Sequence, residues 1–290
     1  MKRSFAAERT ELVLEGRLLR ICRLAAPWYE TVPDVDALIQ VLKRVRPRPD
    51  LFTFFQRVPR VDPKYSYFRE PYSVAALRLG SYNDWFARSI GKKMRRSIKN
   101  ANAKGVVISE REFDDDLVAG IHEVYNETPI RYGKKFPHYG DSIARARSEN
   151  VTYVERSQFL AAYHQDEFVG FAKIVFEDEF ADVLQLLSKM AHRDKNVNSA
   201  LVAKIVEVCA SRGVAYIAYG DWDSGTLTDF KRHCGFARMD LPRYYIPITI
   251  RGSIALKLRL HRPLRTLAPP PVTRLARKAR SCWFHLRMGE

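Results

Sequence analysis

The residues best suited to chemistry lie where a predicted strand passes through a polar loop into a predicted helix. The strand covers 182–188, the loop 189–198 and the amphipathic helix 199–211. Asn198 or Ser199 can cap the start of this helix. The first N–H groups of a helix lack partners and its dipole attracts negative charge, so the junction is suited to binding an anion. A structural β-α-β-α connection without a ligand is the alternative.

Two further segments carry the charge needed to bind phosphate. A helix predicted over 81–104 presents cations at neighbouring positions, and the planar fork of arginine fits phosphate oxygens. Such a row is equally typical of a solvated helix face. The loop 128–140 carries Arg131 and His138 among prolines and glycines, a composition found in binding loops and in rigid exposed connections. The cations of the helix are Lys92, Lys93, Arg95, Arg96, Lys99 and Lys104.

The elements that must position these residues alternate between strands and helices. Residues 12–58 predict a β-α-β pattern with its helix over 34–45, and 73–79 predict another strand. After the helix at 81–104, the order is a strand at 106–110, a helix at 114–127 and a hairpin at 158–163 and 168–176. The rest predicts strands at 182–188, 214–219 and 244–250, with helices at 199–211 and 227–233. We therefore expect a mixed α/β fold with a truncated N-terminal α/β unit.

The composition favours a folded protein with acidic partners. The chain has 290 residues, 46% of them hydrophobic, and a formal net charge of +16. This charge favours nucleic acid, anionic lipid or phosphorylated substrates without choosing among them. The four cysteines form no C-x-x-C pair, so we expect no zinc site and no other metal site. Cys209 and Cys234 are predicted to be reduced core residues, and residues 1–16 lack the apolar core of a secretory signal, so we expect a cytoplasmic location.

The last 40 residues differ from the rest. Residues 254–260 are basic and apolar, 269–271 are three prolines, and 272–288 could form a basic amphipathic helix. Such a tail could touch an anionic membrane through 254–288, touch RNA, or serve only for packing. We expect three parts: a truncated unit at 1–80, a main domain at 81–250 that includes the basic helix 81–104, and the basic tail 251–290.

The order of elements and three motifs together resemble the GNAT superfamily, in particular its FemAB-like (peptidoglycan-bridge aminoacyltransferase) branch. The motifs are KKMRRSIKNANAKGV at 92–106, the hairpin-strand-loop-helix of 158–211, and LTDFKRHCGF at 227–236 before a final strand. The resemblance covers about residues 12–250. It implies a mostly antiparallel central sheet flanked by helices, and an acyltransferase or aminoacyltransferase.

The resemblance also implies where the acyl donor binds. GNAT enzymes hold the donor pyrophosphate on a loop of the pattern Q/R-x-x-G-x-G/A, which corresponds here to residues 193–198. Arg193 fits the pattern, whereas Asn196 and Asn198 replace both glycines. With Ser199 these residues form the expected donor site. The FemAB-like branch uses aminoacyl-tRNA, so the donor is expected to be aminoacyl-tRNA or acyl-CoA as a co-substrate, with no permanently bound cofactor.

Acyl transfer to an amine needs the donor positioned and its carbonyl polarised. Lys231 is the predicted stabiliser of the oxyanion or of a donor phosphate, and Asp221 and Asp223 are candidate bases. A surface lysine and two turn carboxylates are the structural alternatives. The predicted contacts to an acidic or phosphorylated acceptor are Arg95, Lys99, Arg131 and His138.

Two other functions remain open from the sequence: a non-catalytic RNA-binding protein, and a membrane-surface transferase acting on a lipid-linked substrate. RNA binding would fall steeply with salt. The P-loop, dinucleotide, zincin and nucleophile-elbow motifs do not occur in the sequence. The oligomeric state is not predicted.

Overall fold

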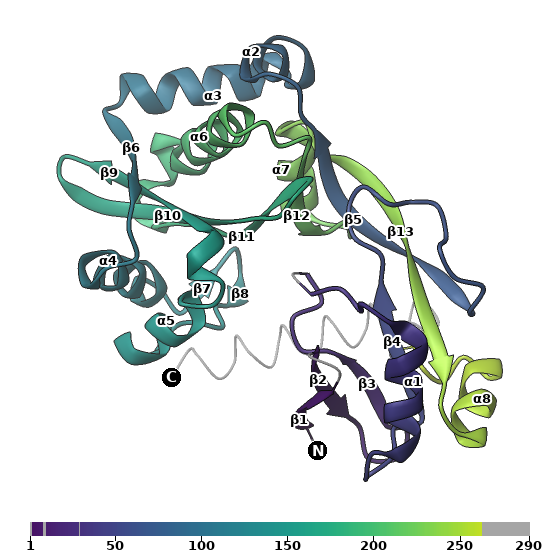
Figure 1. Ribbon diagram of the computed structural model, residues 1–290. Helices are drawn as coiled ribbons and strands as arrows, with labels where there is room; N and C mark the ends of the chain where they lie inside the picture. Colours follow the sequence, from purple (N-terminus) through teal and green to yellow (C-terminus); the bar gives the residue numbers. More distant parts are fainter. Residues whose placement is uncertain (1, 8–9, 29, 263–290) are drawn as a thin grey trace. The chain divides into compact units, whose positions relative to one another are not determined.

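A computed structural model describes residues 2–7, 10–28 and 30–262 (Figure 1). The chain forms two compact units. Unit 1 comprises residues 1–55, 64–70 and 243–290, and unit 2 comprises 56–63 and 71–242. Strands β5 (Arg69–Arg78) and β13 (Ala237–Pro247) have residues in both units. This division into compact units does not test the domain boundaries predicted at residues 80 and 250, which stay a prediction.

Unit 1 is built on a small sheet in the order β1-β2-β3-β4-β13, and only the β3–β4 pair is parallel. Helix α1 connects these parallel strands and buries Val35, Leu38, Ile39 and Leu42. Its elements are β1 (Lys2–Ala7), β2 (Thr10–Glu15), β3 (Ile21–Leu24), α1 (Val35–Arg44), β4 (Leu51–Phe55), part of β13, and α8 (Ile250–Lys257).

Unit 2 is built on a larger sheet in the order β5-β12-β11-β10-β9-β6, and only β11–β12 is parallel. Its strands are β6 (Val106–Arg111), β9 (Ser157–His164), β10 (Glu167–Phe176), β11 (Phe180–Ser188) and β12 (Tyr216–Asp221), beside the short pair β7 (Ile130–Arg131) and β8 (Lys134–Lys135). Its helices are α2 (Tyr82–Asp84), α3 (Lys92–Ala103), α4 (Asp115–Asn126), α5 (Ile143–Asn150), α6 (Val197–Ser211) and α7 (Thr226–His233).

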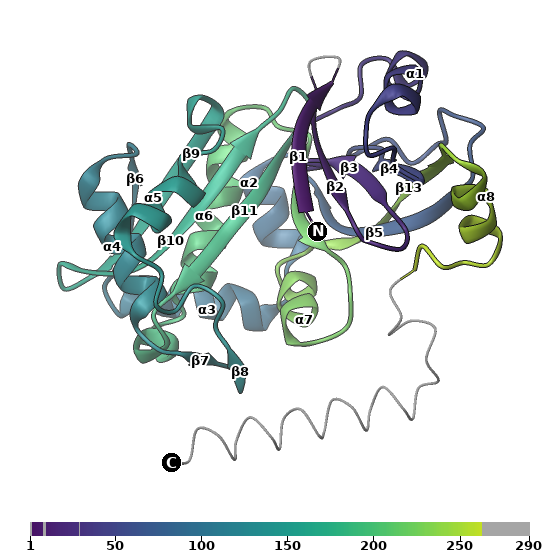
Figure 2. The same ribbon diagram turned by 90° about the horizontal axis from the view of Figure 1, so that it is seen from below.

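The two faces of the unit 2 sheet carry separate cores because strand side chains alternate. Leu160 and Ala162 of β9 face the core under α3 and α6, whereas Phe159 and Ala161 face the core under α4 and α5. Figures 1 and 2 show these helix pairs on opposite faces of the sheet. The expected fold class, a mixed and mostly antiparallel sheet flanked by helices, is confirmed.

Several predicted elements need correction. The single helix predicted over 81–104 is broken, because a π-helical turn at Trp85–Ser89 is followed by Ile90 in an extended conformation. Helix α6 begins two residues earlier than predicted, with Asn196 at its N-cap. The last strand ends at Pro247 instead of 250. The sequence reasoning missed β1, α5 and α8.

The described residues bear on two other expectations. Cys209 and Cys234 are buried and unpaired, as predicted. Within the described ranges, no helix has the length and apolar character needed to cross a membrane. The helix predicted at 272–288 lies outside the described residues.

Candidate active site

Two parallel strands separate at the centre of unit 2. Strand β11 pairs with β12 from Phe180 to Asp182 only, opposite Tyr216 to Ala218. Beyond Asp182, β11 continues to Ser188 against β10, while Asp221 at the end of β12 lies opposite Val74 of β5. Helix α6 follows the first strand and α7 the second, so residues that end or follow both strands can meet where the strands part.

Lys231 projects from α7 toward the end of β12. The residue is 3% exposed, and its Nζ donates to the backbone carbonyl of Asp221 at 2.8 Å. The ammonium also lies 4.7 Å from the ring centre of Tyr219. Burial lowers the pKa of Lys231, while the charges of Asp223, Asp221 and Asp182 act in the opposite direction. Lys231 is therefore a buried cation held by its surroundings, not a surface lysine.

The sequence reasoning missed Asp182, a buried carboxylate at the last paired position of β11. The residue is 3% exposed, and its Oδ1 has no hydrogen-bond partner among the described residues. Burial raises the pKa of Asp182 to about 7, and the positive charges of Arg57 and Lys231 oppose that rise. A charged residue within the apolar run DVLQLLS was the available signal.

The two predicted bases lie near Lys231 but are exposed. Asp221 accepts a hydrogen bond from the Tyr72 hydroxyl at 2.5 Å. Asp223 accepts one from the Thr228 hydroxyl at 2.8 Å, which ties it to the first turn of α7. Both carboxylates remain within electrostatic range of Lys231.

The predicted donor loop forms the start of α6. Asn196 adopts a left-handed conformation with φ of 58°, as a glycine could, and its side chain does not cap the helix. The Oδ1 of Asn198 is buried without a hydrogen-bond partner in the described part of the chain. Ser199 is buried in the first turn. The start of α6 is thus not closed by a side chain of its N-cap, which leaves its N–H groups suited to an anion.

One tyrosine lies beside the predicted donor loop and another lies beside Lys231. The guanidinium of Arg193 lies 5.3 Å from the ring centre of Tyr132, in the turn between β7 and β8. Burial raises the pKa of Tyr219, and Tyr132 is close enough to contribute. Tyr219 in turn lies against Lys231. Tyr132, which the sequence reasoning did not single out, thus lies beside Arg193 and within electrostatic range of Tyr219.

Glu127 and Arg131 hold in place the residues just before the predicted donor loop at 193–198. The carboxylate of Glu127 accepts the N–H groups of Met190 and Ala191 at 2.6 and 2.8 Å. Arg131 pairs with Glu127 at 3.4 Å and donates to the carbonyls of Val124 and Ser188. Because Arg131 is 8% exposed and engaged with the protein, it orders the loop and does not present its charge to an acceptor.

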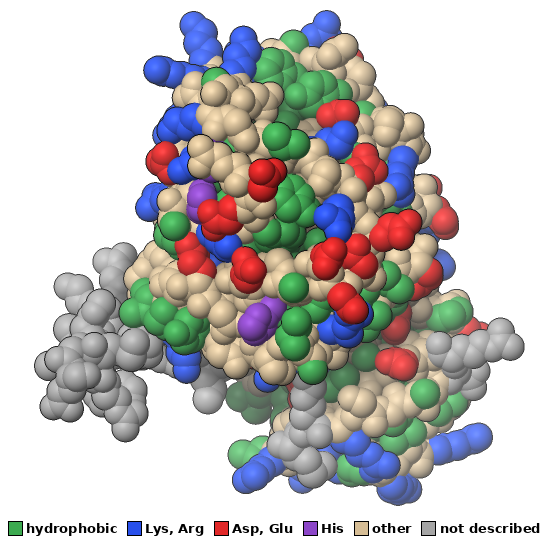
Figure 3. Space-filling view, turned by 90° about the vertical axis from the view of Figure 1, so that its left-hand side faces the viewer, with side chains coloured by type: hydrophobic (Ala, Val, Ile, Leu, Met, Phe, Trp, Pro, Cys, Tyr) green, Lys and Arg blue, Asp and Glu red, His purple; other side chains and the backbone are tan. Residues whose placement is uncertain are grey.

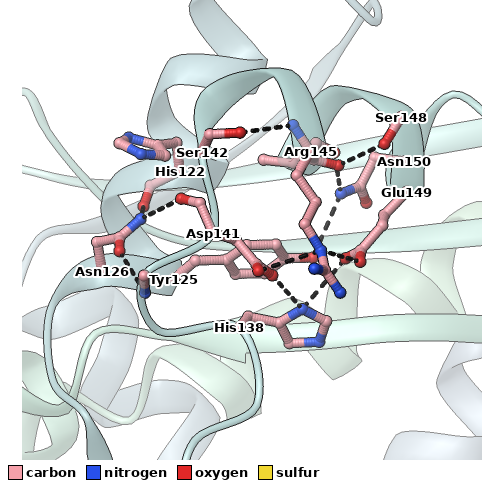
Figure 4. A network of polar contacts seen from close by, with 12 residues as sticks. His122, Tyr125, Asn126, His138, Asp141, Ser142, Arg145, Ser148, Glu149 and Asn150 are labelled. Carbon is pink, nitrogen blue, oxygen red and sulfur yellow. Dashed lines mark hydrogen bonds and ion pairs between the residues drawn. The ribbon is translucent and has the colours of Figure 1, made fainter.

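His138 lies in a separate polar network beside α5 (Figure 4). Its Nδ1 lies 3.2 Å from carboxylate oxygens of both Asp141 and Glu149, and Arg145 pairs with both carboxylates. The ring stacks on Tyr125 with 4.4 Å between centres. The three ligand atoms are close enough to hold a metal ion, so the expected absence of a metal site stays a prediction. The guanidinium of Arg145 offsets one of the two carboxylate charges in this network.

The basic helix α3 packs against α6 and adjoins the donor loop. Arg95 donates to the carbonyls of Phe86 and Ala87, so it stabilises the end of the π-helical turn. Lys104 donates to the Asp194 carbonyl at 2.8 Å, which joins the end of α3 to the donor loop. Lys92, Lys93, Arg96 and Lys99 are exposed. Figure 3 shows Lys and Arg side chains projecting at the top of the view, at the height of α3 in Figure 1.

The part of the chain from β6 to α7 is similar in sequence to a known family. Residues 105–236 match the model of the acetyltransferase (GNAT) family. No curated protein matches the sequence.

Solved structures share the fold over most of the chain. FemX is 10% identical with a TM-score of 0.58, and the match covers 88% of this chain and 90% of FemX. The C-terminal domain of a protein described as a lysylphosphatidylglycerol synthetase of Agrobacterium fabrum is 13% identical with a TM-score of 0.58, covering 88% and 87%. L-PGS of Bacillus licheniformis is 14% identical with a TM-score of 0.57, covering 89% and 88%. Residues 105–236 are therefore similar to the acetyltransferase (GNAT) family, and the chain shares its fold with these solved structures.

Proposed function

We propose that this enzyme transfers an acyl or aminoacyl group from an activated donor to an amine of a small molecule or a cell-envelope precursor. The observation that carries the proposal is the buried ammonium of Lys231, which lies beside the end of β12 and against the ring of Tyr219. A GNAT domain that covers the same residues supports it and does not favour a non-catalytic RNA-binding protein.

The acceptor amine is the nucleophile in the proposed reaction. It attacks the acyl carbonyl carbon, a C–N bond forms, and the donor oxygen or sulfur leaves with the electron pair of its broken bond. Lys231 has three N–H donors and gives one to Asp221, so another can stabilise the developing oxyanion. Asp221 or Asp223 takes the proton that the amine loses.

Asp182 acts through Lys231 in this proposal. Its carboxylate lies within electrostatic range of Lys231, and its charge favours the protonated form of Lys231. Asp182 is therefore a positioning residue that keeps the oxyanion stabiliser charged, and it should matter for kcat more than for substrate binding.

The donor is proposed to be aminoacyl-tRNA, with acyl-CoA or an acyl carrier as the alternatives. Arg193, Asn196, Asn198 and Ser199 would meet its phosphate or its acceptor end at the start of α6. The exposed cations of α3, including Lys99, give a polyanion an adjoining surface that a small thioester would not need. The tRNA assignment predicts donor binding that weakens as salt rises.

The acceptor is proposed to be acidic or phosphorylated. Lys99 remains a candidate contact for it, while Arg95, Arg131 and His138 would influence it only through the structures that they hold. A lipid-linked acceptor at a membrane surface is the second candidate. The name of one structural neighbour refers to a lysylphosphatidylglycerol synthetase, and this is the observation that favours a lipid acceptor.

Transfer assays with purified protein test the proposal. The donors are charged tRNA and acetyl-CoA, and the acceptors are a panel of amines with and without phosphate. Transfer by the wild type that is lost in Lys231→Ala and weakened in Arg193→Ala supports the site. Lys93→Ala, a change at an exposed position of α3, is a control for the loss of one positive charge. Full activity in both Lys231→Ala and Arg193→Ala would exclude this site.

A further inference from the structure

Helix α8 presents a row of aliphatic side chains that unit 1 leaves uncovered. Ile250, Ile254 and Leu258 are spaced by four residues, so they share one face of the helix. They are 81%, 53% and 63% exposed. Leu260 in the following turn is 53% exposed, and Leu18 in the β2–β3 loop is 89% exposed. A continuous exposed apolar surface of this kind marks an interaction site more often than scattered single residues do.

The orientation of α8 is fixed, so this face cannot turn inward. Gly252 packs so closely that a Cβ there would lie 1.9 Å from the carbonyl oxygen of Asp50. Thr249 caps the helix by accepting from the Gly252 N–H, and its hydroxyl donates to the Asp50 carboxylate at 2.8 Å. The opposite face, with Gly252 and Ala255, is buried. The aliphatic face is therefore held outward by contacts on the buried side.

The charges around this face are positive. Arg17, Arg251, Lys257 and Arg259 are exposed, and Arg251 donates to the Leu18 carbonyl, which places the β2–β3 loop beside the helix. The sequence from 250 to 289 contains no Asp or Glu. The carboxylates that lie next to this segment are buried, as Asp50 is, or paired, as Glu70 is with His261 and Arg262. Aliphatic side chains flanked by exposed cations complement an anionic lipid surface, where the chains enter the apolar boundary and the cations meet headgroup phosphates.

We propose that α8 and the β2–β3 loop form a membrane-docking face, consisting of Leu18, Ile250, Ile254, Leu258, Leu260 and the flanking cations, that binds anionic bilayers. This docking would bring the enzyme to amines at a membrane surface. The proposal does not depend on the chemistry of acyl transfer, so it can fail or hold independently of the proposed function.

Vesicle sedimentation with the full-length protein tests the proposal. Vesicles contain phosphatidylcholine alone or phosphatidylcholine mixed with phosphatidylglycerol. The wild type should bind the mixed vesicles and not the neutral ones. The double variant Ile254→Ser/Leu258→Ser should bind at least about tenfold more weakly, because two aliphatic side chains no longer enter the bilayer. Val107→Ser/Val151→Ser removes two exposed aliphatic chains from unit 2 and should bind like the wild type.

A second pair of double variants tests how much the positive charges contribute to vesicle binding. Lys257→Gln/Arg259→Gln should weaken binding to the anionic vesicles, whereas Lys92→Gln/Lys93→Gln, with the same change in net charge on α3, should weaken it less. Melting temperatures and transfer to a water-soluble amine should be unchanged in the α8 variants, since the substituted side chains are exposed and lie outside the candidate active site.

Three results would overturn the proposal. In the first, the wild type does not bind anionic vesicles. In the second, Ile254→Ser/Leu258→Ser binds them as tightly as the wild type, so any membrane contact lies elsewhere in the chain. In the third, sedimentation equilibrium shows a dimer that this double variant dissociates while vesicle binding is absent, so a second copy covers α8.

Discussion

The two units of this protein share a strand pattern but differ at the helix that follows the third strand of the pattern. In both units an antiparallel hairpin leads to a third strand, then to a helix, and then to a fourth strand that pairs in parallel with the third (β3 with β4, and β11 with β12). A strand from elsewhere in the chain then pairs with the fourth strand. In unit 1 the helix is α1, and in unit 2 it is α6. The same order of strands and helix thus occurs with two different kinds of residues at the N-terminus of the helix.

Unit 1 fills its helix start with its own carboxylate. Asp34 accepts the N–H of Ala37 at 2.9 Å, and Asp36 adds a second negative charge in the first turn. Unit 2 places Asn196 at this position without a side-chain cap, and Arg193 and Lys195 precede it. A closed, acidic helix start repels phosphate and an open, basic one attracts it. This difference supports the proposal that the donor binds at the start of α6 and not at the start of α1.

The units also differ after the last parallel strand. Strand β12 leads to α7, which directs Lys231 back to the end of the strand. Strand β4 is followed by residues 56–68, which contain no helix. Among the described residues, unit 1 therefore has no counterpart of α7, the helix that carries the proposed oxyanion stabiliser.

Lys231→Met should lower kcat more than any other variant in this comparison of the two units. Removal of the ammonium should lower kcat by about 10²–10³-fold, because an oxyanion donor is lost, and should leave donor binding nearly intact. The measurement is kcat and KM in the transfer assay. Lys43→Met, an exposed change on α1 of unit 1, should have no effect. Equal kcat values for Lys231→Met and the wild type would remove Lys231 from the mechanism.

Asp182→Asn should lower kcat by about tenfold and change its pH dependence. The Asp182 carboxyl, with its pKa raised to about 7 by burial, is neutral below that pH and charged above it. Since the charged form supports protonated Lys231, kcat of the wild type should rise as pH rises through about 7. The variant should lack that rise. A wild-type profile that is flat from pH 6 to 8 would contradict the role of Asp182.

The same pKa shift has a consequence for stability. The unfolded carboxyl ionises near its ordinary value of about 4, whereas the folded one keeps its proton until about pH 7. The folded state therefore binds more protons in this window, and this group should make the protein less stable as pH rises through it. Asp182→Asn should reduce that dependence in denaturant unfolding followed at several pH values.

Arg193→Ala/Lys195→Ala should raise the donor KM by about tenfold with a smaller change in kcat, since both residues are proposed to bind donor phosphate. The matched variant in unit 1 is Lys43→Ala/Arg44→Ala, which removes two cations from the end of α1. It should not change KM. If the two double variants raise KM equally, the effect is one of net charge and not of the donor loop.

Asp34→Ala should have the smallest effect, and only on stability. Loss of the cap of α1 should lower the free energy of unfolding by about 1 kcal/mol. Chemical denaturation measures this change, and the donor KM should be that of the wild type. A raised KM would indicate that unit 1 takes part in donor binding.

The sequence allowed the donor loop and the Lys231 helix to be predicted because both depend on local patterns. The run 199–211 has helical spacing, and LTDFKRHCGF places Lys231 on a short helix that ends near a glycine. The hairpin of β9 and β10 was equally local.

The surroundings of Asp182 and Arg131 depend in part on contacts that are distant in sequence. Asp182 became notable only because burial in the sheet leaves its carboxylate without a full set of partners. Arg131 was predicted to contact an acceptor, but Glu127 and the Ser188 carbonyl engage it. The continuous helix at 81–104 failed for a local reason, since Ile90 and Gly91 leave helical geometry after the π-helical turn.

The most direct test of whether unit 2 binds the donor is calorimetric titration of two variants that exchange the N-cap residue types of α6 and α1. Asn196→Asp gives α6 the carboxylate that α1 has, and Asp34→Asn gives α1 the amide that α6 has. Charged tRNA and coenzyme A are titrated into each variant and into the wild type. We predict that the wild type binds one of these probes, that Asn196→Asp weakens the binding, and that Asp34→Asn leaves it unchanged. Unchanged affinity in Asn196→Asp, or a loss confined to Asp34→Asn, would contradict a donor site at the start of α6.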